Sequence, residues 1–316
     1  MGGADKLRKR PAAGGAVKMR KRLAIRRADV LTFEAIGYVL ISAIAIFCFI
    51  PFVFVVTGSF TREQSLYLYG YRLIPVEFSL EAYNVIFKAP TQILRSYGVT
   101  AGLTACGTAI GLFVTSMTAY VLSRQDFKYR GKFAFFFYFT TLFSGGMVSS
   151  YIMMIRYLQL KNSPLALLLP GVLNVFYILI MRNFTRSIPD SITESAKIDG
   201  AGDFVIFLRL ILPLMGPALA SIGLFIALGY WNNWYNAMLY IEKQDLFPLQ
   251  YLLYKMINSV RFAAIVASEA GISMPQMPEQ SLKLAMTVVA IGPIMFVYPF
   301  VQRYFIAGIT IGSVKE

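Results

Sequence analysis

Long apolar runs separated by short polar segments dominate the chain from about residue 31 onward. A bilayer span requires about 20 mostly apolar residues. Six runs approach or exceed that length, and they cover roughly residues 35–57, 97–122, 133–155, 165–181, 217–235 and 282–300. Apolar and polar residues do not strictly alternate within them, so the pattern favours helices over a β-barrel. The sequence therefore predicts an all-α, polytopic membrane protein with six transmembrane helices.

The polar segments set the expected organisation around these runs. We expect a basic segment without fixed structure over residues 1–30, a six-helix domain over 31–300 and a tail over 301–316. Lys and Arg collect in the first segment and in residues 124–132, and such residues mark the cytoplasmic flanks of spans. The pattern thus predicts two cytoplasmic termini and an extracytoplasmic segment over residues 236–281.

Composition narrows the function classes. The chain is 57% hydrophobic, carries a net charge of +14 and contains no histidine. The positive charge lies next to the spans, which indicates contact with membrane lipid rather than with nucleic acid. Cys48 and Cys106 fall inside apolar runs, where thiols pack as small apolar groups. The sequence contains no P-loop, nucleophile elbow or metal-ligand cluster, so we expect no catalytic residue, no metal and no bound cofactor.

The polar segment 187–213 lies between two apolar runs and predicts two short helices joined by a sharp turn. Ser191 followed three residues later by Glu194 fits a capping box, so we expect the first helix to begin there. Gly200 can adopt a positive φ and end that helix. Asp203 is a suitable cap for the second. A rigid polar hairpin on one side of a bilayer is suited to receive force from a soluble partner.

This hairpin resembles the EAA loop of ABC-importer permeases. Glu194, Ser195 and Ala196, then Gly200, Leu210 and the pair Leu212–Pro213, stand at the family's spacing, with Ser195 replacing an Ala and Leu210 an Ile. The resemblance implies a type I ABC-importer permease-like fold in which the hairpin enters a cleft of a cytoplasmic ATPase. The residues to which it assigns ATPase coupling are Glu194, Ser195, Ala196, Asp199, Gly200, Ala201, Leu212 and Pro213. Ala196 and Ala201 would keep the inserted surface small, while Glu194 and Asp199 could pair with basic groups or only stabilise the loop.

Other segments resemble the carbohydrate branch of these permeases, the MalG/LplC-like branch. They are residues 143–147, 168–171, 181–184, 231–236, 298–300 and 302–305. The resemblance implies a non-catalytic permease subunit in the bacterial cytoplasmic (inner) membrane that forms half of an oligosaccharide pathway. Its partners would be a second homologous permease, two ATPase subunits that bind ATP and Mg, and an extracytoplasmic solute-binding protein. It also implies that the tail residues Ser313, Val314 and Lys315 contact the ATPase; a frayed chain end is the alternative.

Two polar sites inside apolar runs are candidates for the substrate pathway. The first comprises Trp231, Asn232, Asn233, Trp234 and Asn236, whose rings can stack on sugars and whose amides can bind hydroxyls. An interfacial aromatic belt would explain the rings but not three asparagines. The second comprises Ser144, Gly145 and Gly146, which would form either an unwound patch facing the pathway or a close-packing point.

A second class of function stays open from the residues alone. A self-contained secondary sugar transporter or channel would couple to ions through ionisable residues inside the membrane. The runs 97–122, 165–181, 217–235 and 282–300 hold almost none. The sequence does not name the sugar. Basic residues expected outside would tolerate an acidic oligosaccharide, although acidic residues are interspersed among them.

Overall fold

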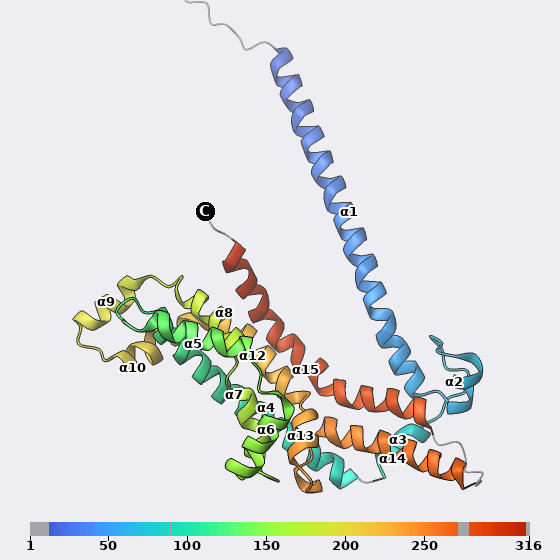
Figure 1. Cartoon of the computed structure of the whole chain (residues 1–316). Coiled ribbons are helices and arrows are strands. Elements are labelled where there is room, and N and C mark those ends of the chain that lie inside the picture. The colour runs from blue at the N-terminus through green and yellow to red at the C-terminus, as the bar shows by residue number, and fades with distance from the viewer. Residues whose placement is uncertain (1–12, 89, 271–277, 314–316) are drawn as a thin grey trace, which may run out of the picture.

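The computed structural model describes residues 13–88, 90–270 and 278–313 (Figure 1). These residues form helices and no β-strand, which confirms the all-α prediction. The helices are α1 (Ala13–Ser59), α2 (Glu63–Tyr69), α3 (Glu81–Ile86), α4 (Pro90–Ser123), α5 (Arg130–Leu142), α6 (Gly146–Ile152), α7 (Pro164–Val172), α8 (Val175–Thr185), α9 (Asp190–Ile198), α10 (Asp203–Ile206), α11 (Leu212–Leu214), α12 (Gly216–Trp231), α13 (Tyr235–Tyr240), α14 (Leu249–Glu269) and α15 (Glu279–Ser313). Short π turns η1 (Met153–Tyr157) and η2 (Phe207–Ile211) and the 3₁₀ turn η3 (Gln244–Leu246) complete the order.

Several expected spans are bent. Only α1 and α4 are long and apolar enough to cross a membrane unbroken within the described residues. Three bent pairs raise that number to five: α5 with α6–η1 at 112°, α7 with α8 at 46°, and α10–α11 with α12 at 83°. The run 282–300 lies within α15. The count of six spans therefore stays a prediction.

Two of the three bends have a local chemical cause. The first follows the expected interruption at Ser144 and Gly145, after which Gly146 takes a φ of +76°. The second was not expected, because Leu173 and Asn174 lie inside an apolar run. There the Asn174 side chain accepts a hydrogen bond of 2.9 Å from the backbone N–H of Phe176, so it caps α8 and starts a new helix.

The body of the molecule is built around α4, which packs against α12, α8 and α7. Close approach depends on glycine: a Cβ on Gly107 would lie 2.4 Å from the ring of Tyr230 and one on Gly171 would lie 2.8 Å from it. The Tyr230 hydroxyl then donates a 2.7 Å hydrogen bond to the carbonyl of Leu168. Tyr230 thus joins three helices at one point.

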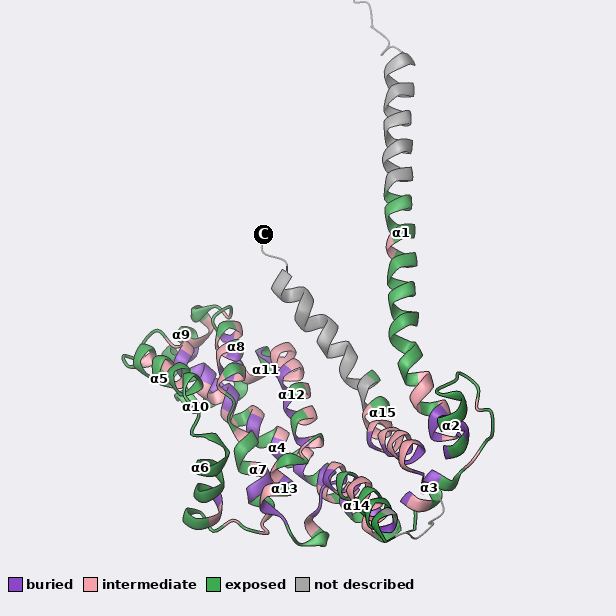
Figure 2. Ribbon diagram, turned by 45° about the vertical axis from the view of Figure 1, so that its right-hand side comes forward, coloured by how far each residue is buried: buried purple, intermediate pink, exposed green. Residues whose placement is uncertain are grey.

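Helix α1 stands apart from this body, and the C-terminal end of α1 contacts α15 (Figures 1 and 2). Within its apolar stretch Val30–Ser59, the 18-residue window that qualifies as a membrane span contains no buried residue. The helix begins at Ala13, within the segment expected to lack structure, because Ala, Lys and Arg are good helix formers. Residues 1–12 of that segment lie outside the described residues.

The C-terminal tail does not form a separate segment up to residue 313. Helix α15 continues without a break from Glu279 to Ser313, so the expected boundary at residue 301 is not a helix end. Val314 and Lys315, two of the three expected tail contacts, lie outside the described residues.

Candidate functional site

The hairpin of α9 and α10 is closed by a Schellman turn at Gly200. The Gly200 N–H donates to the carbonyl of Lys197 at 3.0 Å, and the Ala201 N–H donates to the carbonyl of Ala196 at 2.9 Å. Gly200 has a φ of +80°, which confirms the predicted turn. These bonds satisfy carbonyls at the end of α9 that would otherwise lack a partner, so the turn is rigid.

The two expected N-terminal caps are wrong. Helix α9 begins at Asp190, so Ser191 lies inside the helix and cannot be its cap residue. Pro189 holds that cap position, and its fixed φ of −60° suits the start of a helix. Helix α10 is preceded by Gly202, and the carboxylate of Asp203 binds Arg124 instead of the backbone.

The inner face of the hairpin packs onto the body. Ala196 is 8% exposed and lies in one apolar cluster with Tyr120, Phe207 and Ile211, with Ala201 against it. The small size of Ala196 therefore serves the packing of this chain, not the insertion into a partner's cleft for which we expected it. Tyr120 also stacks on Phe207 with ring centroids 5.6 Å apart.

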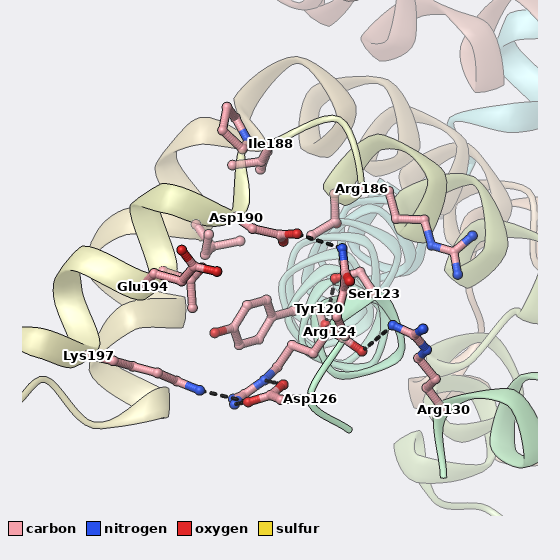
Figure 3. Close-up of a pocket in the computed structure, with 15 residues that line it drawn as sticks. Tyr120, Ser123, Arg124, Asp126, Arg130, Arg186, Ile188, Asp190, Glu194 and Lys197 are labelled. Carbon is pink, nitrogen blue, oxygen red and sulfur yellow. Dashed lines mark hydrogen bonds and ion pairs between the residues drawn. The ribbon is translucent and has the colours of Figure 1, made fainter. Parts of the chain in front are cut away.

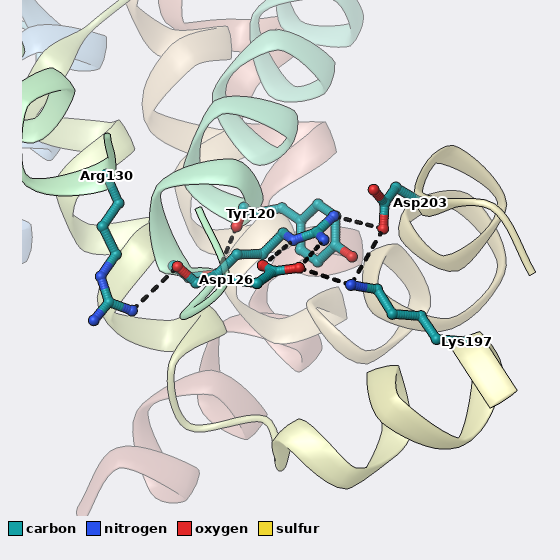
Figure 4. A network of polar contacts seen from close by, with 7 residues as sticks. Tyr120, Asp126, Arg130, Lys197 and Asp203 are labelled. Atoms are coloured by element: carbon teal, nitrogen blue, oxygen red, sulfur yellow. Dashed lines mark hydrogen bonds and ion pairs between the residues drawn. The ribbon is translucent and has the colours of Figure 1, made fainter. Parts of the chain in front are cut away.

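Four charged side chains tie the hairpin to the end of α4; we call them the latch (Figure 4). The Arg124 guanidinium binds both carboxylate oxygens of Asp126, with an Nε–Oδ1 distance of 2.8 Å, and reaches Asp203 at 2.6 Å. Lys197 of α9 lies 2.7 Å from Asp126 and 3.8 Å from Asp203. One network therefore spans α9, α10 and the loop after α4.

Two members of the latch, Asp126 and Arg124, are each stabilised in their charged form by the network. Hydrogen bonds from Arg124, then from Lys197, hold the pKa of the Asp126 carboxyl well below its usual value. The hydrogen bond to Asp126 raises the pKa of Arg124 further. The Arg124 side chain is 16% exposed and lies over the ring of Tyr120 at 5.8 Å, so this cation is anchored by both charge and packing.

A cavity of about 550 Å³ lies between the latch and α9 (Figure 3). Glu194 lines it and its carboxylate points inward. On the opposite wall, the Gln125 side chain donates a 2.7 Å hydrogen bond to Asp190. Glu194, Ser195, Asp199 and Gly200 are all exposed, whereas Leu212 is half-buried and Pro213 is exposed beside the bend to α12.

The tip of the hairpin exposes two large apolar side chains. Ile198 is 86% exposed at the end of α9, and Phe204 is 57% exposed at the start of α10. Large apolar side chains held out by a rigid, ion-paired turn are typical of a surface that is covered by a partner.

The structure divides the pathway candidates among different surroundings. Trp231 donates from Nε1 to the carbonyl of Ala290 at 3.1 Å, which joins α12 to α15. Asn233 donates to the carbonyl of Leu167 at 3.2 Å and, with Asn236, lines a cavity of about 220 Å³ between α7, α8 and α12. Asn232 and Trp234 line a different cavity, of about 410 Å³, that also involves α14 and α15. Ser144, Gly145 and Gly146 are exposed at the bend between α5 and α6.

Sequence reasoning missed the latch. Arg124 had served there only as a mark of membrane orientation, and Asp126 and Lys197 were not considered. The residues that pair in the latch are far apart in the sequence, and Arg124 and Asp203 are separated by 79 positions. A polar cluster directly after a predicted span, facing a charged hairpin, was the available signal.

Comparisons with known proteins place these features in context. No family model matches the chain. The polygalacturonan/rhamnogalacturonan transport system permease protein YtcP of Bacillus subtilis is 40% identical over 283 residues, which cover 90% of this chain and 98% of that protein. Protein LplC of the same organism is 37% identical over 283 residues, 90% of this chain and 95% of that protein. The arabinooligosaccharide permease AraQ of Halalkalibacterium halodurans is 29% identical over 287 residues, 89% of this chain and 95% of that protein.

A solved structure agrees in fold. A bacterial ABC transporter involved in the import of the acidic polysaccharide alginate contains a chain with a TM-score of 0.71 and 29% sequence identity to this one. The match covers 88% of this chain and 98% of that chain.

Proposed function

The chain belongs to the permease subunits of carbohydrate ABC import systems, and from this premise we propose that its hairpin of α9 and α10 is the part that an ATPase subunit moves. A single observation carries the proposal: an exposed apolar tip at Ile198 is mounted on a turn that the latch fixes to α4. A partner that seizes the tip would therefore move the hairpin and α4 together.

The mechanism is alternating access. Closure of two ATPase subunits on ATP shifts the hairpin, and the α10–α11 arm passes this shift through the bend at Met215 into α12. The permease and a second, homologous permease then open outward, where a solute-binding protein delivers the oligosaccharide. The energy source is the different affinity of the partners for the two states. In this assignment the ATP and Mg belong to the ATPase subunits.

The same assignment fixes the orientation in the bacterial inner membrane. The hairpin and the latch face the cytoplasm with both termini, and α13 and α14 lie at the outer side. Helix α12 starts at the hairpin and ends at Trp231, which supports this because its 16 residues span about 24 Å. The tail contact of Ser313, Val314 and Lys315 with the ATPase belongs to the same proposal.

An acidic oligosaccharide is the first substrate to test. Two of the similar proteins carry names that refer to acidic polysaccharides, polygalacturonan and alginate. A polymer of uronates brings one carboxylate per sugar unit into the pathway, so the permease must neutralise that charge or leave it hydrated.

The experiment is a pull-down of the full chain from detergent-solubilised membranes, with ATP hydrolysis assayed in the eluate. We expect a P-loop ATPase and a second permease to be recovered with the wild-type chain. Ile198→Asp should lose most of the recovered ATPase, because it places a charge in an apolar contact. It should leave the amount of inserted chain unchanged, because Ile198 is 86% exposed.

Ile74→Asp is the matched control. Ile74 is 79% exposed in the loop between α2 and α3, far along the chain from the hairpin. The same change there should leave ATPase recovery intact. Equal loss in both variants, or recovery of a homo-oligomer without an ATPase, would reject the coupling proposal and favour a self-contained transporter.

A further inference from the structure

The 410 Å³ cavity beside Asn232 and Trp234 was not expected as a unit, since three separate segments build it. It lies where the end of α12 meets α14 and α15, at the end of α12 remote from the hairpin (Figure 1). Its volume falls within the range of about 300–1,000 Å³ typical of small-molecule sites. The lining residues that carry the argument are Asn232, Trp234, Gln250, Tyr254, Lys283 and Thr287.

Two aromatic rings form one wall of this cavity. The ring centroids of Trp234 and Tyr254 lie 4.9 Å apart at an interplanar angle of 30°, and the two residues are 39% and 40% exposed. Tyr254 is backed by Tyr251, with centroids 6.5 Å apart. A partly stacked pair of this kind still offers an apolar ring surface that can cover the C–H face of a sugar ring while the hydroxyls stay at its edge.

Polar groups stand at the edges of that wall. The Gln250 side-chain N–H₂ donates to Asn232 Oδ1 at 3.2 Å. This bond uses one donor and one acceptor, so the Asn232 N–H₂ and the Gln250 carbonyl retain hydrogen-bonding capacity. Thr287 donates to the carbonyl of Lys283 at 2.8 Å, which leaves its oxygen able to accept. The site can therefore bind hydroxyl groups both as donors and as acceptors.

Lys283 is the charged residue among the lining residues. Its ammonium lies 2.7 Å from Glu279, which Arg261 also contacts at 2.9 Å. Two cations thus share one carboxylate, and the trio carries a net positive charge. Two other basic residues, Arg95 and Lys161, are each paired with a single carboxylate, in Arg95–Asp245 at 2.6 Å and Lys161–Glu242 at 2.7 Å. The trio of Lys283, Arg261 and Glu279 therefore places one uncompensated positive charge beside the aromatic wall.

We propose that this cavity binds one uronate unit of an acidic oligosaccharide during import, with the sugar ring against Trp234 and Tyr254 and its carboxylate on Lys283. The inference rests on the proposed function and adds the residues that select the substrate. The uronate carboxylate neutralises the remaining positive charge of Lys283, Arg261 and Glu279. The Asn232 and Gln250 amides bind the hydroxyls of the sugar ring.

The test uses the fact that the chain has two tryptophans. Trp231→Phe leaves Trp234 as the single tryptophan, inside the cavity, and excitation at 295 nm selects it over the tyrosines. The full-length variant is purified in nanodiscs of neutral phosphatidylcholine and titrated with trigalacturonate. We expect the Trp234 emission to change with saturation, and Lys283→Gln to weaken the affinity by about ten- to a hundredfold, because a charge-assisted hydrogen bond is lost.

Three controls make the outcome specific. Fully methyl-esterified trigalacturonate should bind the wild-type pocket as weakly as the acid binds Lys283→Gln, and Lys283→Arg should restore the preference for the acid. Lys255→Gln should change the affinity less than twofold, because Lys255 lies over the ring of Phe247 at 4.8 Å and does not line the cavity. Should Trp231→Phe fail to fold, the wild-type chain is compared with Trp234→Phe instead.

Absence of a Trp234 response, or an equal loss for acid and ester in Lys283→Gln, overturns the inference. So does displacement of the signal by phosphatidylglycerol in the disc, which would assign the cavity to a lipid headgroup. This assay contains no ATPase, so its failure leaves the coupling proposal standing. A pull-down without an ATPase would reject the coupling while leaving the binding result untouched.

Discussion

At the scale of single residues, glycine positions decide which contacts the fold can make. Gly200 holds a φ of +80°, and a Cβ added there would meet no atom within 4 Å, so its constraint comes from the backbone alone. Gly107 has an ordinary φ but no room, because Tyr230 occupies the place of its side chain. The two glycines therefore respond differently to the same substitution.

Gly200→Ala should destabilise the hairpin by about 1–2 kcal/mol, since a Cβ disfavours the left-handed region by that amount. Sugar uptake should fall while the chain still inserts, and Gly200→Asn should be milder because Asn tolerates this conformation. Gly202→Ala is the control, since Gly202 is equally open but has a φ of −71°. Equal uptake in the two Ala variants would contradict the backbone explanation.

Gly107→Ala should lower the free energy of unfolding by about 1–3 kcal/mol, the usual cost of overpacking a core. The added methyl would lie 2.4 Å from the Tyr230 ring and force α4 away from α12. Gly102→Ala, with nothing within 4 Å, serves as the control on the same helix. The melting temperature in detergent measures both, and a similar shift for both would show that helix packing is not involved.

Residues could be predicted from the sequence where one backbone conformation or one motif decides their role. Gly200 is such a case, because a turn of this spacing needs a residue that accepts positive φ. Arg124 and Asp203 are not, because their pairing depends on how α4 and α10 meet in space. The same holds for Lys283, which joins an aromatic wall only through the packing of α14 on α15.

At the scale of elements, helix α15 is held at its start by a side chain from a distant helix. Glu63 of α2 is 3% exposed and accepts hydrogen bonds of 2.8 Å from the backbone N–H groups of Gln280 and Ser281. The Ser281 hydroxyl donates a further bond of 2.7 Å to it. A carboxylate at a helix N-terminus also interacts favourably with the helix dipole. Glu63 therefore fixes α15 against α2.

Glu63→Gln should cost about 1–3 kcal/mol, because one oxygen that accepts backbone hydrogen bonds becomes an N–H₂ donor facing another donor. Glu77→Gln is a matched control, since Glu77 forms an ion pair with Arg62 in which both side chains are 53% exposed. That change should cost about 0–1 kcal/mol. Thermal denaturation of the purified chain distinguishes the two, and a larger effect at Glu77 would refute the assigned role.

The apolar pattern predicted where helices lie but not where they break. The bend at Ser144 and Gly145 was visible because small residues interrupted a run. The bend at Asn174 was hidden, since one capping amide inside an apolar stretch does not change the hydrophobic pattern. The continuation of α15 to Ser313 was hidden too, because Pro299 lies inside it and a proline usually ends or kinks a helix.

At the scale of the whole molecule, the fold leaves α1 uncovered while the other helices pack together. An apolar window of 18 residues without a buried residue requires lipid or a second membrane subunit around it. The family assignment came from the spacing of the hairpin motif, and the 40% identical relative confirms it.

The proposed orientation predicts opposite labelling of two loops. In a Cys48→Ser, Cys106→Ser background, a cysteine at Lys161 should react with a membrane-impermeant maleimide in intact cells. A cysteine at Lys128 should react only after permeabilisation, because the loop between α4 and α5 is cytoplasmic in this orientation. Both residues are exposed, so access to the reagent depends on the side of the membrane. The reverse pattern would invert the proposed topology.

The bend at Met215 makes α10–α11 and α12 the two unequal arms of an angled lever. A short arm of 12 residues, Asp203–Leu214, meets the long arm α12 of 16 residues at 83°, and Met215 at the corner is fully buried. If the two arms rotate as one rigid body about that corner, the displacement at the far end of α12 is nearly perpendicular to the displacement at the tip of the short arm. The size of the displacement scales with arm length, so with equal rise per residue it is about one third larger at the far end of α12 than at the tip of the short arm. A small stroke on the cytoplasmic side thus becomes a larger sideways stroke at Trp231 and the cavity beside it.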